Sequence, residues 1–231
     1  MLGSDFPESV KRFHTDITDY QRLKDDIDFL KPKAIVNCAN VGTFDSEVDP
    51  QRAYLVHVAG STNLAELCSK LGIKLIQISS VYSGSDGVYG KTKEMAEDCV
   101  LGINSWFAVV RLPWLFGQKN DKHFNNYVIR SLRAGEKIDI YDEVGMPTFT
   151  RDVADYILLH GIGITGKVDV MNDGVASRFL WASEIARRLG FSETLLEERN
   201  KRSQLVLHQG GKQIKLRSWT KALGDCLDGL R

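Results

Sequence analysis

Short apolar runs alternate along this chain with longer segments in which apolar residues recur every three or four positions. The short runs are typical of buried strands, and the longer period is typical of helices that cover a sheet. Strands are predicted at residues 13–16, 34–39, 74–79, 106–112, 137–141 and 167–171. Helices are predicted at residues 19–30, 50–71, 90–101, 125–134, 151–160 and 176–189. This alternation predicts an α/β fold on a parallel sheet.

The composition is typical of a globular protein and limits which classes of binding partner are expected. The 231 residues are 43% hydrophobic and 26% charged, which suits one domain, or one domain with a small lobe. The formal net charge is zero, so the net charge provides no long-range electrostatic attraction to nucleic acid or to an anionic membrane. The basic stretch at residues 197–217 is interpreted as a solvated surface rather than a phosphate-binding patch.

The cysteines and the first residues carry no sign of metal binding or secretion. Cys38, Cys68, Cys99 and Cys226 are widely spaced, without the paired spacing of zinc ligands, and we interpret them as buried thiols in a reducing compartment. No apolar run approaches the length of a membrane span, and the N-terminus lacks the apolar core of a signal peptide. A cytoplasmic protein without a metal site is expected.

Candidate chemistry lies where one apolar strand ends in Ser80 and the next helix begins with Tyr89 and Lys93. The carboxyl ends of parallel strands form the edge at which ligands bind. A Tyr hydroxyl near an ammonium group can donate a proton, and a Ser hydroxyl can bind the same substrate oxygen. These groups suit carbonyl reduction beside a nicotinamide. The same spacing in Tyr20 and Lys24 has no such strand before it and is interpreted as a solvated helix face.

Several further segments, in a fixed order, resemble one family: the extended short-chain dehydrogenase/reductases, in particular the dTDP-4-dehydrorhamnose reductase branch. The similar segments are residues 16–19, 31–39, 58–65, 78–80, 89–93, 110–117, 145–152 and 186–190. The resemblance implies a Rossmann-like, doubly wound parallel sheet that lacks its first βαβ unit. Residues 1–117 would form the incomplete dinucleotide-binding core. Residues 118–231 would form mainly a small interleaved substrate lobe, with about 148–172 returning to the core.

The function implied by this resemblance is the reduction of a nucleotide-sugar carbonyl by NADPH or NADH. Ser80 would polarise the carbonyl, Tyr89 would deliver the proton, and Lys93 would hold the nicotinamide ribose and lower the pKa of Tyr89. Pro113 would pack near the carboxamide. A sugar epimerase is the nearest enzymatic alternative. A non-catalytic regulatory or binding subunit that keeps the fold is the alternative from another class.

The resemblance also implies an adenosine side of the cofactor site. Asp16 and Ile17 would flank the adenine, and Cys38 and Ala39 would lie against the adenosine ribose and the diphosphate. The structural alternatives stay open: Asp16 as a turn residue beside a helix, and Cys38 and Ala39 as small core residues.

Three departures from the family pattern change what is expected. The chain has no glycine-rich turn of the kind that holds the cofactor diphosphate, so dinucleotide binding is expected to be weak. His57 replaces the family's Asn, and Val81 replaces the Asp that usually follows the catalytic hydroxyl. The segment 82–88 is short, so a more open substrate pocket is expected.

The order of strands in such a sheet has one further consequence. The first two strands of a 3-2-1-4-5-6 sheet lie between the third and the fourth, so without them the strand at 34–39 becomes an apolar edge. Three outcomes are open: the strand at 13–16 pairs with it directly, a second copy or a partner subunit covers it, or the sequence is an incomplete version of a longer protein.

Overall fold

The structure, a computed structural model, describes residues 2–119, 123–203 and 212–228. Within these residues the central sheet has five parallel strands in the order β1-β2-β3-β7-β10. The strands are Ala34–Asn37, Lys74–Ser80, Ala108–Leu112, Gly166–Asp173 and Lys212–Ser218. The predicted α/β fold with a parallel sheet is therefore confirmed.

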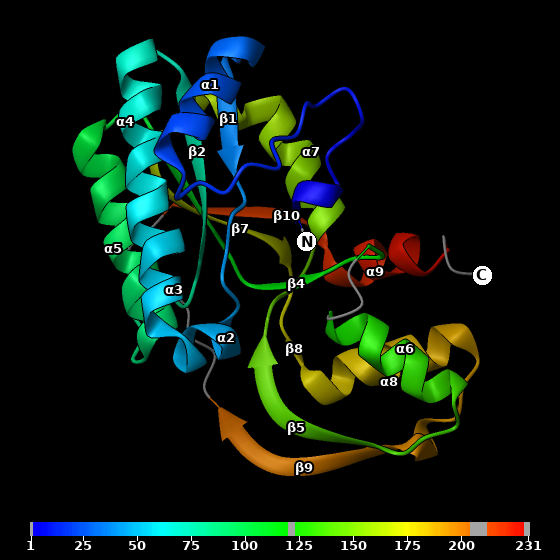
Figure 1. Cartoon of the computed structure of the whole chain (residues 1–231). Helices are drawn as coiled ribbons and strands as arrows, with labels where there is room; N and C mark the ends of the chain where they lie inside the picture. Colours follow the sequence, from blue (N-terminus) through cyan, green and yellow to red (C-terminus); the bar gives the residue numbers. More distant parts are fainter. Residues whose placement is uncertain (1, 120–122, 204–211, 229–231) are drawn as a thin grey trace.

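One face of the sheet is covered by α1 (Tyr20–Leu30), α4 (Ser61–Leu71) and α5 (Val88–Ile103) (Figure 1). Their apolar stripes pack on strand residues such as Ile35 and Leu75 in a shared core. The predicted long helix at 50–71 is one helical run of three parts, α3 (Pro50–Tyr54), a π-helical segment η2 (Leu55–Gly60), and α4. It ends at Gly72 in the left-handed region, as the sequence predicts.

The opposite face is covered by α7 (Thr150–His160) together with the N-terminal segment, which opens with the short turn η1 (Leu2–Ser4) (Figure 1). Buried Leu2 and Phe6 join Val153 and Ile157 of α7 against the strands. Strand side chains alternate between the two faces. Both faces are therefore covered, which explains why β2 and β3 are buried along almost their whole length.

A second group of elements lies beyond the carboxyl ends of β1 and β2 (Figure 1). It contains α6 (Phe124–Arg133), α8 (Arg178–Leu189) and α9 (Trp219–Asp228), which share a core centred on Trp181. With them lie β5 (Ile138–Gly145), β8 (Ala176–Ser177) and β9 (Leu196–Ser203), paired in the order β8-β5-β9. Two short strands, β4 (Trp114–Phe116) and β6 (Pro147–Phe149), pair with each other, and α2 (Thr43–Val48) follows β1.

The strand predicted at residues 13–16 is wrong. The carboxylate of Asp16 accepts hydrogen bonds from the N–H and hydroxyl of Thr18, and Asp19 then caps α1 by accepting from the N–H of Arg22. This turn chemistry competes with strand formation, because it fixes the backbone locally. The direct pairing of these residues with β1 is therefore not seen.

The start of one predicted helix and the interpretation of the basic stretch also need correction. The helix predicted at 176–189 begins only at Arg178, because the Ser177 hydroxyl accepts from the N–H of Leu180 and caps it there. The stretch interpreted as a basic surface contains β9 and β10. In β10 the basic residues alternate with Ile214 and Leu216, which pack against the α7 side of the core. The exposed charges of Lys215 and Arg217 on its outer face conceal a half-buried strand.

Candidate active site

The three residues predicted to carry the chemistry lie together at the carboxyl edge of the sheet. Ser80 is the last residue of β2, and Tyr89 and Lys93 lie on the first two turns of α5. The Ser80 side chain is close enough to Tyr89 to act on the pKa of its hydroxyl. The Lys93 Nζ lies 5.8 Å from the centroid of the Tyr89 ring. Ser80 and Lys93 are only 5% and 3% exposed, so both act in surroundings that largely exclude water.

Burial controls the protonation of this cluster. It raises the pKa of the Tyr89 hydroxyl, against the opposing effect of the hydrogen bond with Ser80. It also lowers the pKa of Lys93 to about 8, while Glu97 and Cys38 act in the opposite direction. Burial outweighs the opposing effect of Ser80, so the net shift of the Tyr89 pKa is upward, and the expected effect of Lys93 on this pKa stays a prediction. Tyr89 holds its proton at neutral pH, which is the form that a proton donor needs.

The start of α5 is held by a carboxylate from another helix. Glu47 of α2 accepts hydrogen bonds from the backbone N–H groups of Val88 and Tyr89, both at 3.1 Å. These N–H groups have no partner within the helix, so an acidic side chain satisfies them and complements the helix dipole. Gly87 precedes the helix with a φ of +99°, a value that glycine adopts without strain.

A buried ionic cluster anchors the other side of α5. The carboxylate of Glu97, which is fully buried, accepts from the Ser79 hydroxyl at 2.6 Å and from the Arg111 Nε at 2.9 Å. Lys167 Nζ lies 3.2 Å from the same carboxylate. The contacts join α5 to β2, β3 and β7, and Glu97 lies one helical turn beyond Lys93. The cluster therefore fixes the helix that carries Tyr89 and Lys93, the two residues predicted to act in catalysis.

The predicted adenosine-side residues border a cavity of about 920 Å³ beside the free edge of β1. Ile17, Cys38 and Ala39 line it. Burial raises the pKa of the Cys38 thiol to about 12, so it stays protonated. Asp16 does not line the cavity. Its carboxylate is bound to Thr18 and lies 3.1 Å from Arg52, which agrees with the interpretation of Asp16 as a turn residue.

Pro113 directly follows the residue that pairs with Ser80 and so lies at the catalytic edge. Beside it, the Trp114 Nε1–H donates to the hydroxyl of Tyr82 at 2.7 Å. The guanidinium of Arg178 lies 3.7 Å from the Trp114 ring centroid. Sequence reasoning missed these three side chains, because their contacts join distant parts of the chain and leave no local pattern.

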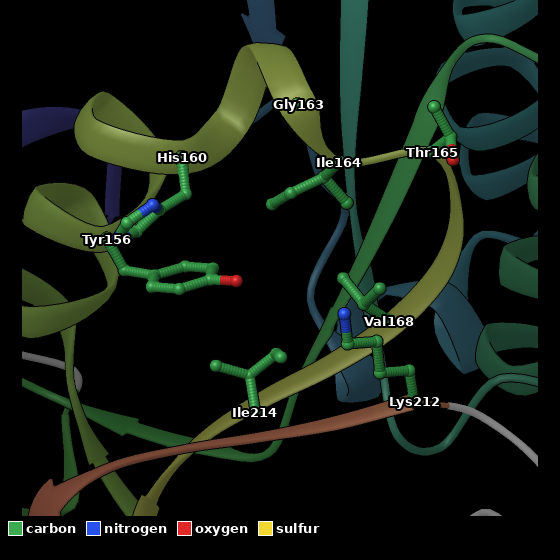
Figure 2. A pocket seen from close by; sticks show the side chains of 8 residues that line it. All are labelled: Tyr156, His160, Gly163, Ile164, Thr165, Val168, Lys212 and Ile214. Carbon is green, nitrogen blue, oxygen red and sulfur yellow. The ribbon is translucent and has the colours of Figure 1, made fainter.

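A second cavity, of about 500 Å³, lies away from the catalytic edge, near the start of β10 (Figure 2). Figure 2 shows Tyr156 and His160 of α7 facing Lys212 and Ile214 of β10 across it. The Tyr156 and His160 rings are 4.9 Å apart. None of the residues predicted to act in catalysis or cofactor binding lines this cavity.

Membrane-spanning helices and clusters of metal-binding side chains are both absent from the described part of the chain. Among residues 2–119, 123–203 and 212–228, no helix combines the length and apolar character that crossing a bilayer requires. Within the same described residues, no group of three or more His, Cys, Asp or Glu side chains is arranged to hold a metal ion.

Comparison with sequence families matches residues 7–231 to the RmlD substrate binding domain. A dTDP-4-dehydrorhamnose reductase of Mycobacterium tuberculosis H37Rv is 31% identical over 180 residues, which cover 68% of this chain and 59% of the relative. A dTDP-4-keto-6-deoxy-D-glucose reductase of Streptomyces niveus is 29% identical over 201 residues, which cover 79% of this chain and 69% of the relative. The chain thus spans less than two thirds of the mycobacterial relative.

Solved structures share the fold. The dTDP-4-dehydrorhamnose reductase of Bacillus anthracis in complex with NADP has a TM-score of 0.86 at 20% identity, covering 99% of this chain and 94% of that one. The UDP-glucose 4-epimerase of Thermus thermophilus in complex with NAD has a TM-score of 0.71 at 18% identity. The match covers 97% of this chain and 80% of the epimerase. At these identities the likeness concerns the fold.

Proposed function

Because the chain belongs to the RmlD substrate binding domain family, we propose that it reduces a nucleotide-sugar carbonyl with NADPH or NADH, as the names of its dTDP-4-dehydrorhamnose reductase relatives indicate for them. The observation that carries the proposal is the placing of Ser80, Tyr89 and Lys93 at one edge of the sheet, with the Lys93 Nζ 5.8 Å from the Tyr89 ring centroid. A regulatory subunit without turnover would have no need to keep these three groups together.

In the proposed reaction Tyr89 gives its phenol proton to the carbonyl oxygen. Ser80, which lies beside Tyr89 at the same edge of the sheet, donates a hydrogen bond to the same oxygen and polarises the carbonyl. A bound reduced nicotinamide would supply the hydride for the carbonyl carbon. Proton transfer leaves a phenolate on Tyr89. The ammonium of Lys93 stabilises that phenolate, because opposite charges in a buried site interact strongly.

The cavity beside β1 suits the adenosine half of the cofactor. Its volume of about 920 Å³ lies within the usual range of small-molecule sites, roughly 300–1,000 Å³. Ile17 would offer apolar contact to the adenine, and Ala39 would lie against the adenosine ribose and the diphosphate. Lys11 and Arg12, which line the same cavity, would face the phosphates. Both cations are exposed and no glycine-rich turn accompanies them, so weak binding stays our prediction.

The lobe formed mainly by residues 118–231 is proposed to hold the nucleotide sugar. Arg178 of this lobe stacks on Trp114, and its side chain is 22% exposed. Its nearest carboxylate, Glu143, lies 3.7 Å away. A partly buried guanidinium beside aromatic rings suits the recognition of a phosphate.

The first test compares two conservative substitutions, Tyr89→Phe and Tyr20→Phe. With dTDP-4-dehydrorhamnose and NADPH at millimolar concentration, Tyr89→Phe is expected to lower kcat by about 10²- to 10⁴-fold, the usual contribution of a positioned proton donor. NADPH fluorescence titration is expected to show unchanged cofactor affinity, because only one oxygen is lost.

Tyr20→Phe is the matched control. Tyr20 precedes Lys24 with the same spacing but lies at the start of α1, so its kcat is expected to stay within about twofold of the unsubstituted protein. No turnover by the unsubstituted protein, or equal losses from the two substitutions, would contradict the proposed function. Turnover that regenerates the oxidised cofactor without net reduction would favour an epimerase.

A further inference from the structure

His57 is a buried histidine that the proposed reaction does not use. It is 1% exposed and lies within η2, the π-helical segment between α3 and α4. π-helical segments are rare, and they occur often at functional sites. The side chain lies next to the catalytic cluster: its ring centroid is 5.7 Å from that of Tyr89, with the two rings at 83° to each other.

The hydrogen bonds of His57 determine which of its two ring nitrogens carries the proton. The backbone N–H of Val41 donates to Nε2 at 3.0 Å, so Nε2 carries no proton. The proton of a neutral ring must then be on Nδ1, which lies 2.8 Å from the Thr92 hydroxyl oxygen and donates to it. The Thr92 hydroxyl in turn donates to the carbonyl of Val88 at 2.8 Å. One tautomer satisfies the whole chain of bonds.

A neutral ring agrees with its surroundings. Burial lowers the pKa of His57 to about 3, and the positive charge of Lys93 acts in the same direction. A protonated ring would also have two N–H donors, one of them facing the N–H of Val41. The imidazole is therefore uncharged over the whole physiological range.

The partners of His57 come from two segments to which the proposed function assigns roles. Val41 lies just beyond Cys38 and Ala39, on the segment that leaves β1 toward α2. Thr92 lies on α5 between Tyr89 and Lys93. The ring thus joins the proposed cofactor segment to the catalytic helix and contacts the Tyr89 ring at its side.

We propose that His57 is a positioning residue that orients Tyr89 and couples it, through Thr92 and Val41, to the segment after β1. His57 supplies the lateral edge contact, with ring centroids 5.7 Å apart, that fixes the plane of the Tyr89 ring. The kinetic part of this proposal rests on the proposed function, and its geometric part does not.

The geometric part is tested without turnover, by ¹⁵N NMR of the imidazoles in the unsubstituted protein. We expect His57 to show the Nδ1–H tautomer and no titration from about pH 5 to about pH 9, whereas an ordinary histidine titrates near pH 6.5. The Tyr89 ring resonances, assigned with Tyr89→Phe, are expected to shift in Thr92→Val and to stay in place in Thr92→Ser. Valine has the shape of threonine but lacks the hydroxyl, and serine keeps it.

The kinetic part uses three substitutions that separate the contacts. His57→Gln keeps an acceptor for Val41, His57→Asn keeps a donor for Thr92, and His57→Phe keeps only the ring.

We expect His57→Phe and Thr92→Val to lower kcat by about tenfold or more, since small misplacements of a reacting group are costly. The KM for the nucleotide sugar is expected to stay within about twofold. Thr92→Ser is expected to retain kcat. His160→Gln, at an exposed histidine of the second cavity, is the control and is expected to change neither value.

The outcomes separate the two proposals. An Nε2–H tautomer, a titration near pH 6.5, or unchanged Tyr89 resonances in Thr92→Val would overturn the positioning role. So would a fall in kcat/KM that comes from KM alone. An unsubstituted protein without turnover that still shows the expected tautomer and resonance shifts would overturn the proposed function and leave the orienting contact established.

Discussion

The carboxylate of Glu97 is the residue on which the position of the catalytic helix depends most directly. It is fully buried and pairs with Arg111 at 2.5 Å, with the Ser79 hydroxyl as a further donor. A buried ion pair of this kind gives little net stability compared with an apolar pair, but the loss of one partner leaves an uncompensated charge. Arg111 would become that charge.

We therefore expect Glu97→Gln to lower the free energy of unfolding by about 3–5 kcal/mol at neutral pH, as measured by urea denaturation. Glu66→Gln is the control, because it removes an exposed partner that lies 3.7 Å from Lys70. It is expected to change the free energy of unfolding by less than about 1 kcal/mol. Similar losses in both variants would contradict the role given to the buried cluster.

The pH dependence of this effect has a definite sign. Burial raises the pKa of Glu97, but hydrogen bonds from Arg111 and Ser79 and the charge of Arg111 outweigh it, so the pKa in the folded protein is below its ordinary 4.5. A carboxyl with a lowered pKa stabilises the fold above its unfolded pKa, and this contribution is lost as the pH falls through the folded value. The difference between the unsubstituted protein and Glu97→Gln is thus expected to be constant above about pH 5 and to shrink below it.

The residues of the site that the sequence could predict share a simple property. Ser80, Tyr89 and Lys93 lie on one strand–turn–helix unit, so their spacing alone brings them to the same edge. His57 and Trp114 reach the site through contacts with residues that are remote in sequence, and no local periodicity encodes such contacts. The resemblance implies a place for Asp16 beside the adenine, and this stays a prediction; the structure shows its carboxylate accepting from the N–H of Thr18.

At the level of elements, the turn between β2 and α5 is packed so closely that it sets where α5 begins. A Cβ atom at Gly90 would lie 2.5 Å from the Ser85 carbonyl oxygen and 2.8 Å from that of Tyr82. Both are backbone atoms, so they cannot move aside as a side chain would. The turn and the first turn of α5 therefore fit only if residue 90 has no side chain.

Gly90→Ala is accordingly expected to lower the free energy of unfolding by about 1–3 kcal/mol, the usual cost of overpacking, and to lower kcat by displacing Tyr89. Gly102→Ala on the same helix is the control. It meets no atom within 4 Å, so it is expected to stabilise the protein by up to about 1 kcal/mol through helix propensity. Thermal melting of both variants checks the prediction, and a stabilised Gly90→Ala would contradict it.

Periodicity predicted most elements, and it failed where another interaction controls the backbone. The helices α1, α5 and α7 were predicted to within a few residues, because each has one apolar stripe facing the sheet. The strand at 13–16 was not formed, since the turn at Asp16 satisfies the local backbone instead. The strand β10 was missed because its exposed face is basic.

At the level of the whole molecule, β1 is the outermost strand of the described sheet, and its outer edge faces the large cavity. The Lys33 carbonyl accepts from the N–H of Lys74, so residue 33 faces β2. Peptide groups alternate in direction along a strand, and the N–H groups of Ala34 and Val36 therefore point away from β2. An open edge of this kind pairs with other chains.

We expect the 231-residue chain to form dimers or larger species in size-exclusion chromatography with light scattering. Ala34→Pro, which removes one outward N–H at the first residue of the strand, is expected to reduce this association. Ala34→Val keeps the N–H and is expected to preserve it. A clean monomer with a sharp melt above about 65 °C, the top of the usual mesophile range, would contradict the prediction.

The π-helical segment η2 makes the position of His57 depend on the length of the chain before it. A π-helical turn contains more residues than an α-helical turn, so it acts as an insertion within a helix. Each residue of an α-helix rotates the chain by about 100°. Deletion of a single residue at Val56 would let the run revert to a plain α-helix and rotate α3 relative to α4. His57 would leave Tyr89, although every partner residue would remain in the sequence. Variation among homologous chains at this site is therefore expected as gain or loss of a residue, which changes the phase of the helix, as well as exchange of one side chain for another.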